Sequence, residues 1–271
     1  MEKNFINTSF SKKLKSMLNV DFKRLSVSPF FYVMVGISLV VPILILVMTT
    51  MMDGVVTNNP QTGLPGEPMQ GFDYVWQILG SLSGTSVEQS GMTMDLVSMC
   101  NINMMFFAVA VFVCIFISED FRSGYAKNLF SVRARKTDYV ISKSIVCFAG
   151  SACMFIAFFI GAIIGGAVAD LPFTMQGFNG ANLVFCMLSK IFLIPVFVSI
   201  FTLMSVIAKQ KSWLAICLSL GVGMLLFMMI STLTPLNANI VNVLASIAGS
   251  VLFAVGMGAI SNLVLKKTSL I

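Results

Sequence analysis

Charged residues are scarce in this chain. Only 10% of its 271 residues are Asp, Glu, Lys or Arg, whereas soluble proteins carry about 25%. Hydrophobic residues make up 57%, and the mean hydropathy is +0.93. So few charges cannot cover a water-exposed surface. The composition therefore excludes an ordinary soluble enzyme and a disordered chain, and it indicates an integral membrane protein.

Histidine is absent altogether. Its absence excludes Ser-His-Asp and Cys-His catalytic arrangements and every zinc site that contains histidine. The six cysteines lie in or beside apolar runs, and no two of them form a C-x-x-C pair. We therefore expect packed thiols rather than a disulfide framework or a metal site, and no catalytic residues in this chain.

Long apolar runs are abundant. A helix needs about 20 apolar residues to cross the hydrocarbon core, and these runs are continuous rather than alternating, which favours helices over strands. We predict an all-α polytopic membrane protein with a cytoplasmic segment 1–29 and a transmembrane domain 30–271. The six predicted transmembrane helices are Phe30–Met52, Leu96–Ser118, Ser144–Ala169, Leu183–Ala208, Trp213–Ser231 and Val243–Leu265.

The basic residues gather on one side of this topology. Sixteen of the 17 Lys and Arg residues, all except Lys190, lie on this side. They come before the first run, between the second and third, between the fourth and fifth, and after the sixth. The opposite connections, 53–95, 170–182 and 232–242, contain none. The positive-inside rule then predicts that both termini are cytoplasmic. We expect the chain itself to lie in the cytoplasmic membrane of a bacterium. The net charge of +6 suits an anionic lipid bilayer as partner, and we expect no nucleic-acid binding.

The segment Phe10–Leu25 has apolar residues at helical spacing, with lysines between them. This pattern predicts an amphipathic helix in the cytoplasmic interface, which leads into the first span. The alternative is a polar leader without regular structure.

The stretch 119–143 interleaves apolar and charged residues between the second and third spans. We expect a short helix parallel to the membrane, which offers aromatic and basic side chains to a soluble partner. Its predicted apolar face consists of Tyr125, Leu129, Phe130 and Val132.

The order of residues in this stretch resembles that of the type 2 permeases of ATP-binding cassette (ABC) exporters. The matching features are the acidic pair Glu119–Asp120, Phe-Arg-x-Gly at 121–124, Asn-Leu-Phe-Ser at 128–131, and the Arg, Tyr and Lys before the third span. Tyr125 stands where Thr is common in the family, and no Gly or Pro follows Ser131.

The resemblance implies a coupling helix that docks on a cytoplasmic ABC ATP-binding subunit, and a second permease as a homo- or heterodimeric partner. The residues implied for coupling are Glu119, Arg122, Gly124, Tyr125, Leu129, Phe130, Arg135, Tyr139 and Lys143. The chain has no G-x-x-x-x-G-K-[ST] phosphate-binding loop, so ATP and Mg²⁺ are expected on the partner and no cofactor on this chain.

Polar residues inside the spans are candidates for a substrate path. Lys190 lies in the fourth run, and Asn101 and Asn103 lie in the second. A lysine inside the membrane is costly and marks a functional position. If the fourth span begins at Lys190 instead, its side chain snorkels outward. The two asparagines can equally form structural hydrogen bonds between helices.

These observations predict a permease that exports a lipophilic or peptide substrate, such as an antimicrobial peptide or a drug, using a separate ATPase. One alternative is a secondary transporter or channel, which would be expected to carry acidic residues within its spans. Another is the substrate-capturing membrane subunit of an importer.

Overall fold

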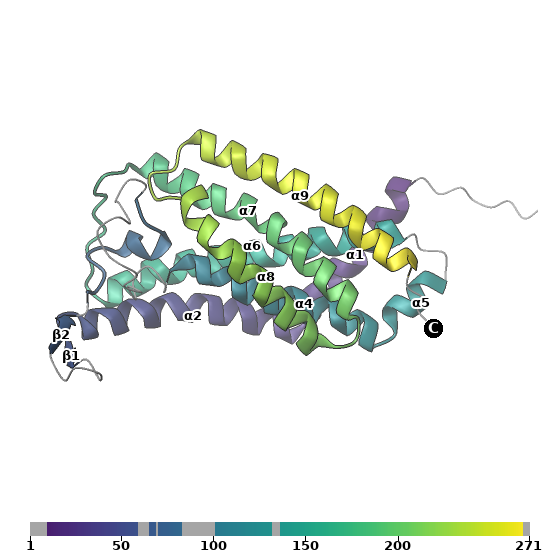
Figure 1. The fold of residues 1–271 in the computed structure, drawn as a ribbon, viewed down its shortest axis with the longest axis horizontal. Coiled ribbons are helices and arrows are strands. Elements are labelled where there is room, and N and C mark those ends of the chain that lie inside the picture. The colour runs from purple at the N-terminus through teal and green to yellow at the C-terminus, as the bar shows by residue number, and fades with distance from the viewer. Residues whose placement is uncertain (1–9, 59–64, 69, 83–100, 132–135, 268–271) are drawn as a thin grey trace, which may run out of the picture.

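The computed structural model describes residues 10–58, 65–68, 70–82, 101–131 and 136–267, which form a bundle of long helices (Figure 1). The α-helices are α1 Phe10–Val27, α2 Pro29–Met52, α4 Met105–Arg122, α5 Tyr125–Ser131, α6 Lys136–Val168, α7 Gly180–Ala208, α8 Ser212–Leu233 and α9 Ile240–Lys267. Strand β1 (Val56–Asn58) pairs antiparallel with β2 (Pro65–Pro68). Two short 3₁₀ helices complete the described part, η1 Val75–Leu79 and η2 Ile102–Met104.

Five of the described helices are long and apolar enough to cross a membrane. They are Pro29–Met52, Ile102–Arg122, Lys136–Val168, Gly180–Ala208 and Ile240–Lys267. The sixth predicted span falls on α8, whose segment Ser212–Phe227 is apolar but shorter. The predicted start of the second span, up to Cys100, lies outside the described residues. The chain is thus a helical multi-pass membrane protein, and a sixth crossing stays a prediction.

The largest difference from the predicted boundaries concerns the charged stretch. Helix α4 continues to Arg122 instead of ending at Ser118, and α6 begins at Lys136 instead of Ser144. The end of α4 and the beginning of α6 therefore contain charged residues. The apolar pattern did not indicate that these residues are helical. The physical reason for two of these charges is pairing: Lys143 of α6 forms ion pairs with Asp21 on α1 and with Asp120 on α4.

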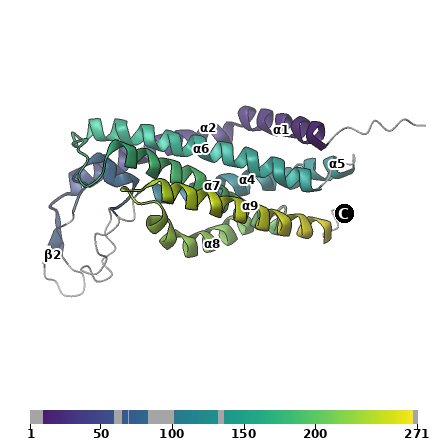
Figure 2. The ribbon, with the colours of Figure 1, turned by 90° about the horizontal axis from the view of Figure 1, so that it is seen from above.

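The bundle has a buried centre and apolar flanks. Along α4 and α7 most residues are buried, whereas α2 and α9 expose large apolar side chains such as Val33 and Val255. Figure 2 shows α1 and α8 on opposite sides of the bundle. Exposed apolar flanks of this kind are suited to contact with lipid.

Small residues allow α6 to pack tightly against α2. The Gly161–Gly165 pair faces α2: a Cβ atom at Gly161 would overlap the backbone oxygen of Leu39, and one at Gly165 would lie 2.8 Å from the Cα atom of Ile43. This G-x-x-x-G spacing therefore permits a close contact within the chain.

The two ends of the bundle differ in charge. Helices α1 and α5 and the end of α9 lie at one end, and the β1–β2 pair lies at the other (Figure 1). We call the first the basic end, because Arg24, Arg122, Lys127 and Lys267 lie there. At the opposite end, η1 is packed into the bundle with Val75, Ile78 and Leu79 fully buried.

Candidate functional site

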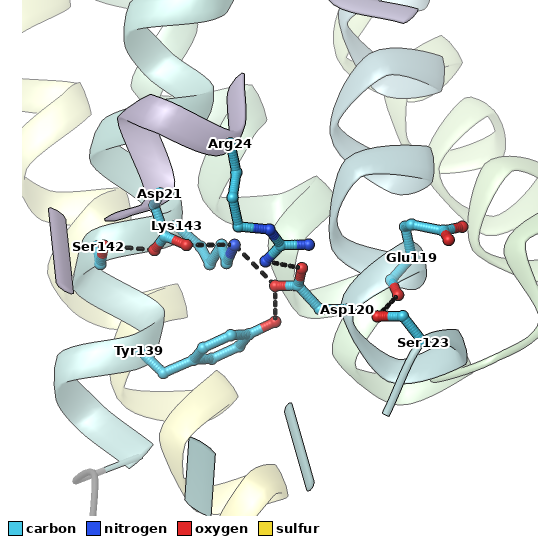
Figure 3. A network of polar contacts seen from close by, with 8 residues as sticks. All are labelled: Asp21, Arg24, Glu119, Asp120, Ser123, Tyr139, Ser142 and Lys143. Carbon is cyan, nitrogen blue, oxygen red and sulfur yellow. Dashed lines mark hydrogen bonds and ion pairs between the residues drawn. The ribbon is translucent and has the colours of Figure 1, made fainter. Parts of the chain in front are cut away.

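A cluster of ionic side chains joins three helices at the basic end, and we call it the charge network. Its members are Asp21 and Arg24 on α1, Asp120 on α4, and Tyr139, Ser142 and Lys143 on α6 (Figure 3). Helical spacing brings them together, because residues three or four positions apart share one face of a helix. Sequence positions on three separate helices thereby meet at one point.

Lys143 is the centre of the charge network. Its Nζ atom lies 2.7 Å from Oδ1 of Asp21 and 2.7 Å from Oδ2 of Asp120, and all three side chains are fully buried. Arg24 completes the charge balance through Nη1, which lies 2.6 Å from the other Asp120 oxygen. Two cations therefore meet two carboxylates. A buried ion is tolerated only when it is paired and hydrogen-bonded in this way.

The two carboxylates also accept hydrogen bonds from hydroxyl groups. Ser142 donates to Oδ2 of Asp21 at 2.6 Å, and the Tyr139 hydroxyl donates to Oδ2 of Asp120 at 2.9 Å. Each of the four carboxylate oxygens thus has at least one donor. A fully satisfied network of this kind makes the relative position of its helices rigid.

Arg24 connects the charge network to α5. Its guanidinium carbon lies 4.1 Å from the centre of the Tyr125 ring, a cation–π contact. Partial burial acts to lower the pKa of Arg24, but the Asp120 carboxylate outweighs it and the pKa lies above its usual value. Burial, with the Asp21 charge, raises the pKa of Tyr125. Both groups therefore keep their charge states at neutral pH, the arginine cationic and the tyrosine neutral.

Helix α5 has an inner and an outer face. Ala126 is buried, Leu129 and Phe130 pack partly buried against the core, and the Phe130 ring lies 5.4 Å from that of Tyr139. Lys127 and Asn128 are exposed. The aromatic side of this helix is thus partly buried against its own bundle, and its contact with a partner stays a prediction.

Gly124 makes the turn from α4 into α5. Its φ of +75° is a conformation that side-chain-bearing residues rarely adopt. Arg122, just before this turn, is exposed. The turn thus places Arg122 and Lys127 at the outer surface of the basic end.

The other residues expected from the sequence divide between these places. Tyr139 and Lys143 belong to the charge network. Glu119 is exposed and points away from it (Figure 3), with its backbone oxygen accepting a hydrogen bond from the Ser123 hydroxyl at 2.7 Å. Arg135 lies outside the described residues, as does Val132.

Sequence reasoning missed four members of the charge network: Asp21, Arg24, Asp120 and Ser142. On α4, the acid that pairs with Lys143 is Asp120. The predicted coupling residue was its neighbour Glu119. One signal was present. Asp21 is an acid on the predicted apolar side of the N-terminal helix, where it needs a partner.

A second polar cluster, the Lys190 cluster, lies near the opposite end of the bundle. The Nζ atom of Lys190 donates to Oδ1 of Asn103 and to Oγ1 of Thr234, both at 2.8 Å. Asn101 accepts a hydrogen bond from the backbone N–H of Asn103 at 2.9 Å. All these side chains are buried. The three candidate path residues are thus brought into one cluster, to which Thr234 is added.

The snorkelling interpretation of Lys190 is corrected by this geometry. Helix α7 runs without a break from Gly180 to Ala208, so Lys190 lies within it, and its side chain has no exposed surface. Polar partners on η2 and at the end of α8 explain why the ammonium group turns inward. Within the described ranges, Lys190 forms no ion pair with a carboxylate.

Comparison with known protein families identifies a match over most of the chain. A family model described as "ABC-2 family transporter protein" matches residues 17–226, most of the 271-residue chain. The matched region includes the whole charge network and the turn into α5. Neither a curated protein nor a solved structure matches the chain.

Proposed function

Because the chain belongs to the ABC-2 family of transporter proteins, we propose that it is the membrane-spanning permease subunit of an ATP-driven ABC exporter. A separate cytoplasmic subunit binds ATP and Mg²⁺ and hydrolyses the nucleotide. The absence of a phosphate-binding loop in the sequence supports this division of labour. The permease itself contributes the path through the membrane.

The observation that carries this proposal is the attachment of α5 to the rest of the bundle. Tyr125 of α5 contacts Arg24, and Arg24 is paired with Asp120 of α4. Lys143 then continues the connection from Asp120 to α6. A force applied to α5 by a partner is therefore passed to three other helices, as a coupling helix requires.

The docking surface that we propose consists of exposed charged residues around the α4–α5 turn. Glu119, Arg122 and Lys127 lie there with their side chains in solvent. Charged rims of this kind steer association and set its orientation. In this proposal the aromatic residues of α5 act from within, by holding the helix on the bundle.

The distribution of charge supports the orientation that we propose. The basic end carries basic residues and the sequence connections at the other end carry none, which favours a cytoplasmic location for α1, α5 and both termini. Helix α1 then lies at the cytoplasmic interface. The attachment point for the ATPase is thus on the side where ATP is available.

The Lys190 cluster, with Asn101 and Asn103, is proposed to lie beside the substrate path, towards the outer side of the membrane. The substrate is lipophilic or a peptide, of the antimicrobial peptide or drug class. The apolar flanks of α2 and α9 offer surfaces for lipid and for a second permease, identical or not.

One observation favours a different class of function. Lys190 is a buried titratable group bonded to neutral oxygens, and such groups also serve ion-coupled secondary transporters. Transport by the reconstituted chain without any ATPase would favour this alternative.

The proposal is tested by co-purification of the full-length permease with the ATP-binding subunit encoded beside it. We expect the parent chain to retain the subunit. Arg122→Glu combined with Lys127→Glu should reduce the retained amount about tenfold, which corresponds to about 1.4 kcal/mol of binding free energy. The reason is that the substitutions reverse the charge of the exposed surface on both sides of the turn.

The matched control is Lys266→Glu, a charge reversal at an exposed position of the last turn of α9. It should leave the retained amount unchanged. Failure of the parent chain to associate, or equal losses in the double variant and the control, contradicts docking at α5.

A further inference from the structure

A shallow hollow lies where α1 turns into α2. It has a volume of about 410 Å³ and is lined by Val20, Lys23, Arg24, Val27 and Ser28. The helices there belong to the basic end, beside the charge network. Of the residues that line it, only Arg24 takes part in the coupling role described above.

The hollow is on the outward face of α1. Met17, Asp21 and Leu25 form the buried face of this helix, four residues apart. Val20 and Val27 lie on the other side, 44% and 71% exposed. The hollow therefore opens to the surroundings of the protein, and its apolar walls are unfavourable in contact with water alone.

The lining combines apolar walls with positive charge. Lys23 is exposed, and Arg24 keeps 31% of its side chain exposed although it is paired with Asp120. A guanidinium has five N–H donors, and the ion pair uses only one nitrogen. Among the described residues that line the hollow there is no acid. The site is thus complementary to a group that is anionic at its head and apolar behind it.

We propose that this hollow binds an anionic phospholipid of the cytoplasmic leaflet. The lipid phosphate contacts Lys23 and the free donors of Arg24, and an acyl chain lies along Val20 and Val27. A free phosphate ion would leave the apolar walls uncovered, whereas a phospholipid covers both parts. The inference rests on the proposed orientation, which puts α1 at the cytoplasmic interface, where anionic lipids attract basic groups.

The position of Arg24 gives the lipid a route to the coupling helix. The same guanidinium that faces the hollow contacts the Tyr125 ring and pairs with Asp120. A phosphate beside it adds a negative charge to the charge network at the point where α1 meets α5. The lipid phosphate would thus be a third contact of the Arg24 guanidinium, beside Asp120 and Tyr125.

The test is lipid titration of the purified full-length chain in detergent, followed by native mass spectrometry of the first bound lipid. The two probes are phosphatidylglycerol and phosphatidylcholine with identical acyl chains. We expect phosphatidylglycerol to bind more tightly. Lys23→Gln should weaken its binding about fivefold, the change that corresponds to the ~1 kcal/mol typical of one basic group at an anionic surface. Phosphatidylcholine binding should weaken less, because the choline cation of its own headgroup balances the phosphate.

The matched control is Lys15→Gln, which removes the same charge from an exposed position of α1 outside the hollow. It should leave both affinities unchanged. Equal weakening by Lys15→Gln and Lys23→Gln would mean diffuse attraction and overturn the site. Displacement of phosphatidylglycerol by millimolar sodium phosphate would mean a free-anion site and overturn the lipid. No ATPase enters the experiment, so its outcome is separate from that of the co-purification.

Discussion

Lys143 is fully buried, and the two acids it pairs with come from two different helices. Lys143→Met should destabilise the protein by about 3–5 kcal/mol, because it leaves the buried Asp21 carboxylate without its cation, whereas Asp120 keeps Arg24. Thermal unfolding of the purified full-length chain in detergent measures the loss. The double variant Lys143→Met with Asp21→Asn should recover a large part of it, since the uncompensated charge of Asp21 is then removed as well.

Lys266→Met is the control for this prediction, because Lys266 is exposed in the last turn of α9. Surface substitutions of this kind usually change stability by less than about 0.5 kcal/mol. If Lys143→Met costs no more than this control, or if the double variant is less stable than the single one, the charge network does not hold the helices together.

The sequence pointed to Lys143 and Tyr139 but not to their partners, for a physical reason. A local pattern shows that a charged residue lies beside an apolar run. It does not show which distant residue of opposite charge forms an ion pair with it. Two whole predicted spans, Phe30–Met52 and Leu96–Ser118, lie between Asp21 and Lys143. Glu119 and Asp120 are equivalent in sequence, and only the helical rotation at the end of α4 decides that Asp120 faces inward.

Among the elements, the contact between α2 and α6 depends on the absence of side chains. Gly161→Ala should lower stability by about 1–3 kcal/mol, because the added methyl group meets the Leu39 backbone and the helices must separate. Alanine is the better helix former in isolation, so any loss reports the contact between helices. The unfolding temperature of the full-length chain in detergent measures it.

Gly256→Ala on α9 is the matched substitution. A Cβ atom at Gly256 would meet nothing within 4 Å. Stability should therefore be unchanged or slightly raised. A loss at Gly256 equal to that at Gly161 would show that glycine acts through the helix itself and not through packing on α2.

The predictability of the elements depended on their polarity. Apolar runs marked the helices along most of their length, as in Pro29–Met52, where the prediction began one residue later. The beginning of α6 was missed because Asp138 and Lys143 interrupt the run, although both are buried. Helix ends are thus predictable where an apolar run stops at water or lipid, and not where the helix continues through buried charged residues.

At the scale of the whole molecule, the two ends of the bundle offer opposite environments. One end gathers basic residues around α1 and α5, and the described part of the other end is closed by η1. The proposed attachment of an ATPase requires the basic end to face the cytoplasm. The orientation is therefore the property on which the proposed function and the proposed lipid site both depend.

Cysteine labelling in intact cells tests this orientation. Lys127 on α5 and Gln176 between α6 and α7 are both exposed, at opposite ends of the bundle. With a membrane-impermeant maleimide, Gln176→Cys should be labelled in intact cells and Lys127→Cys only after the membrane is permeabilised. The described natural cysteines are free thiols, which can also react with the maleimide. Labelling of the parent chain therefore gives the background that is subtracted. The reverse pattern of labelling would put α5 outside the cell, away from ATP, and would leave the chain without a surface on which a cytoplasmic ATPase could act.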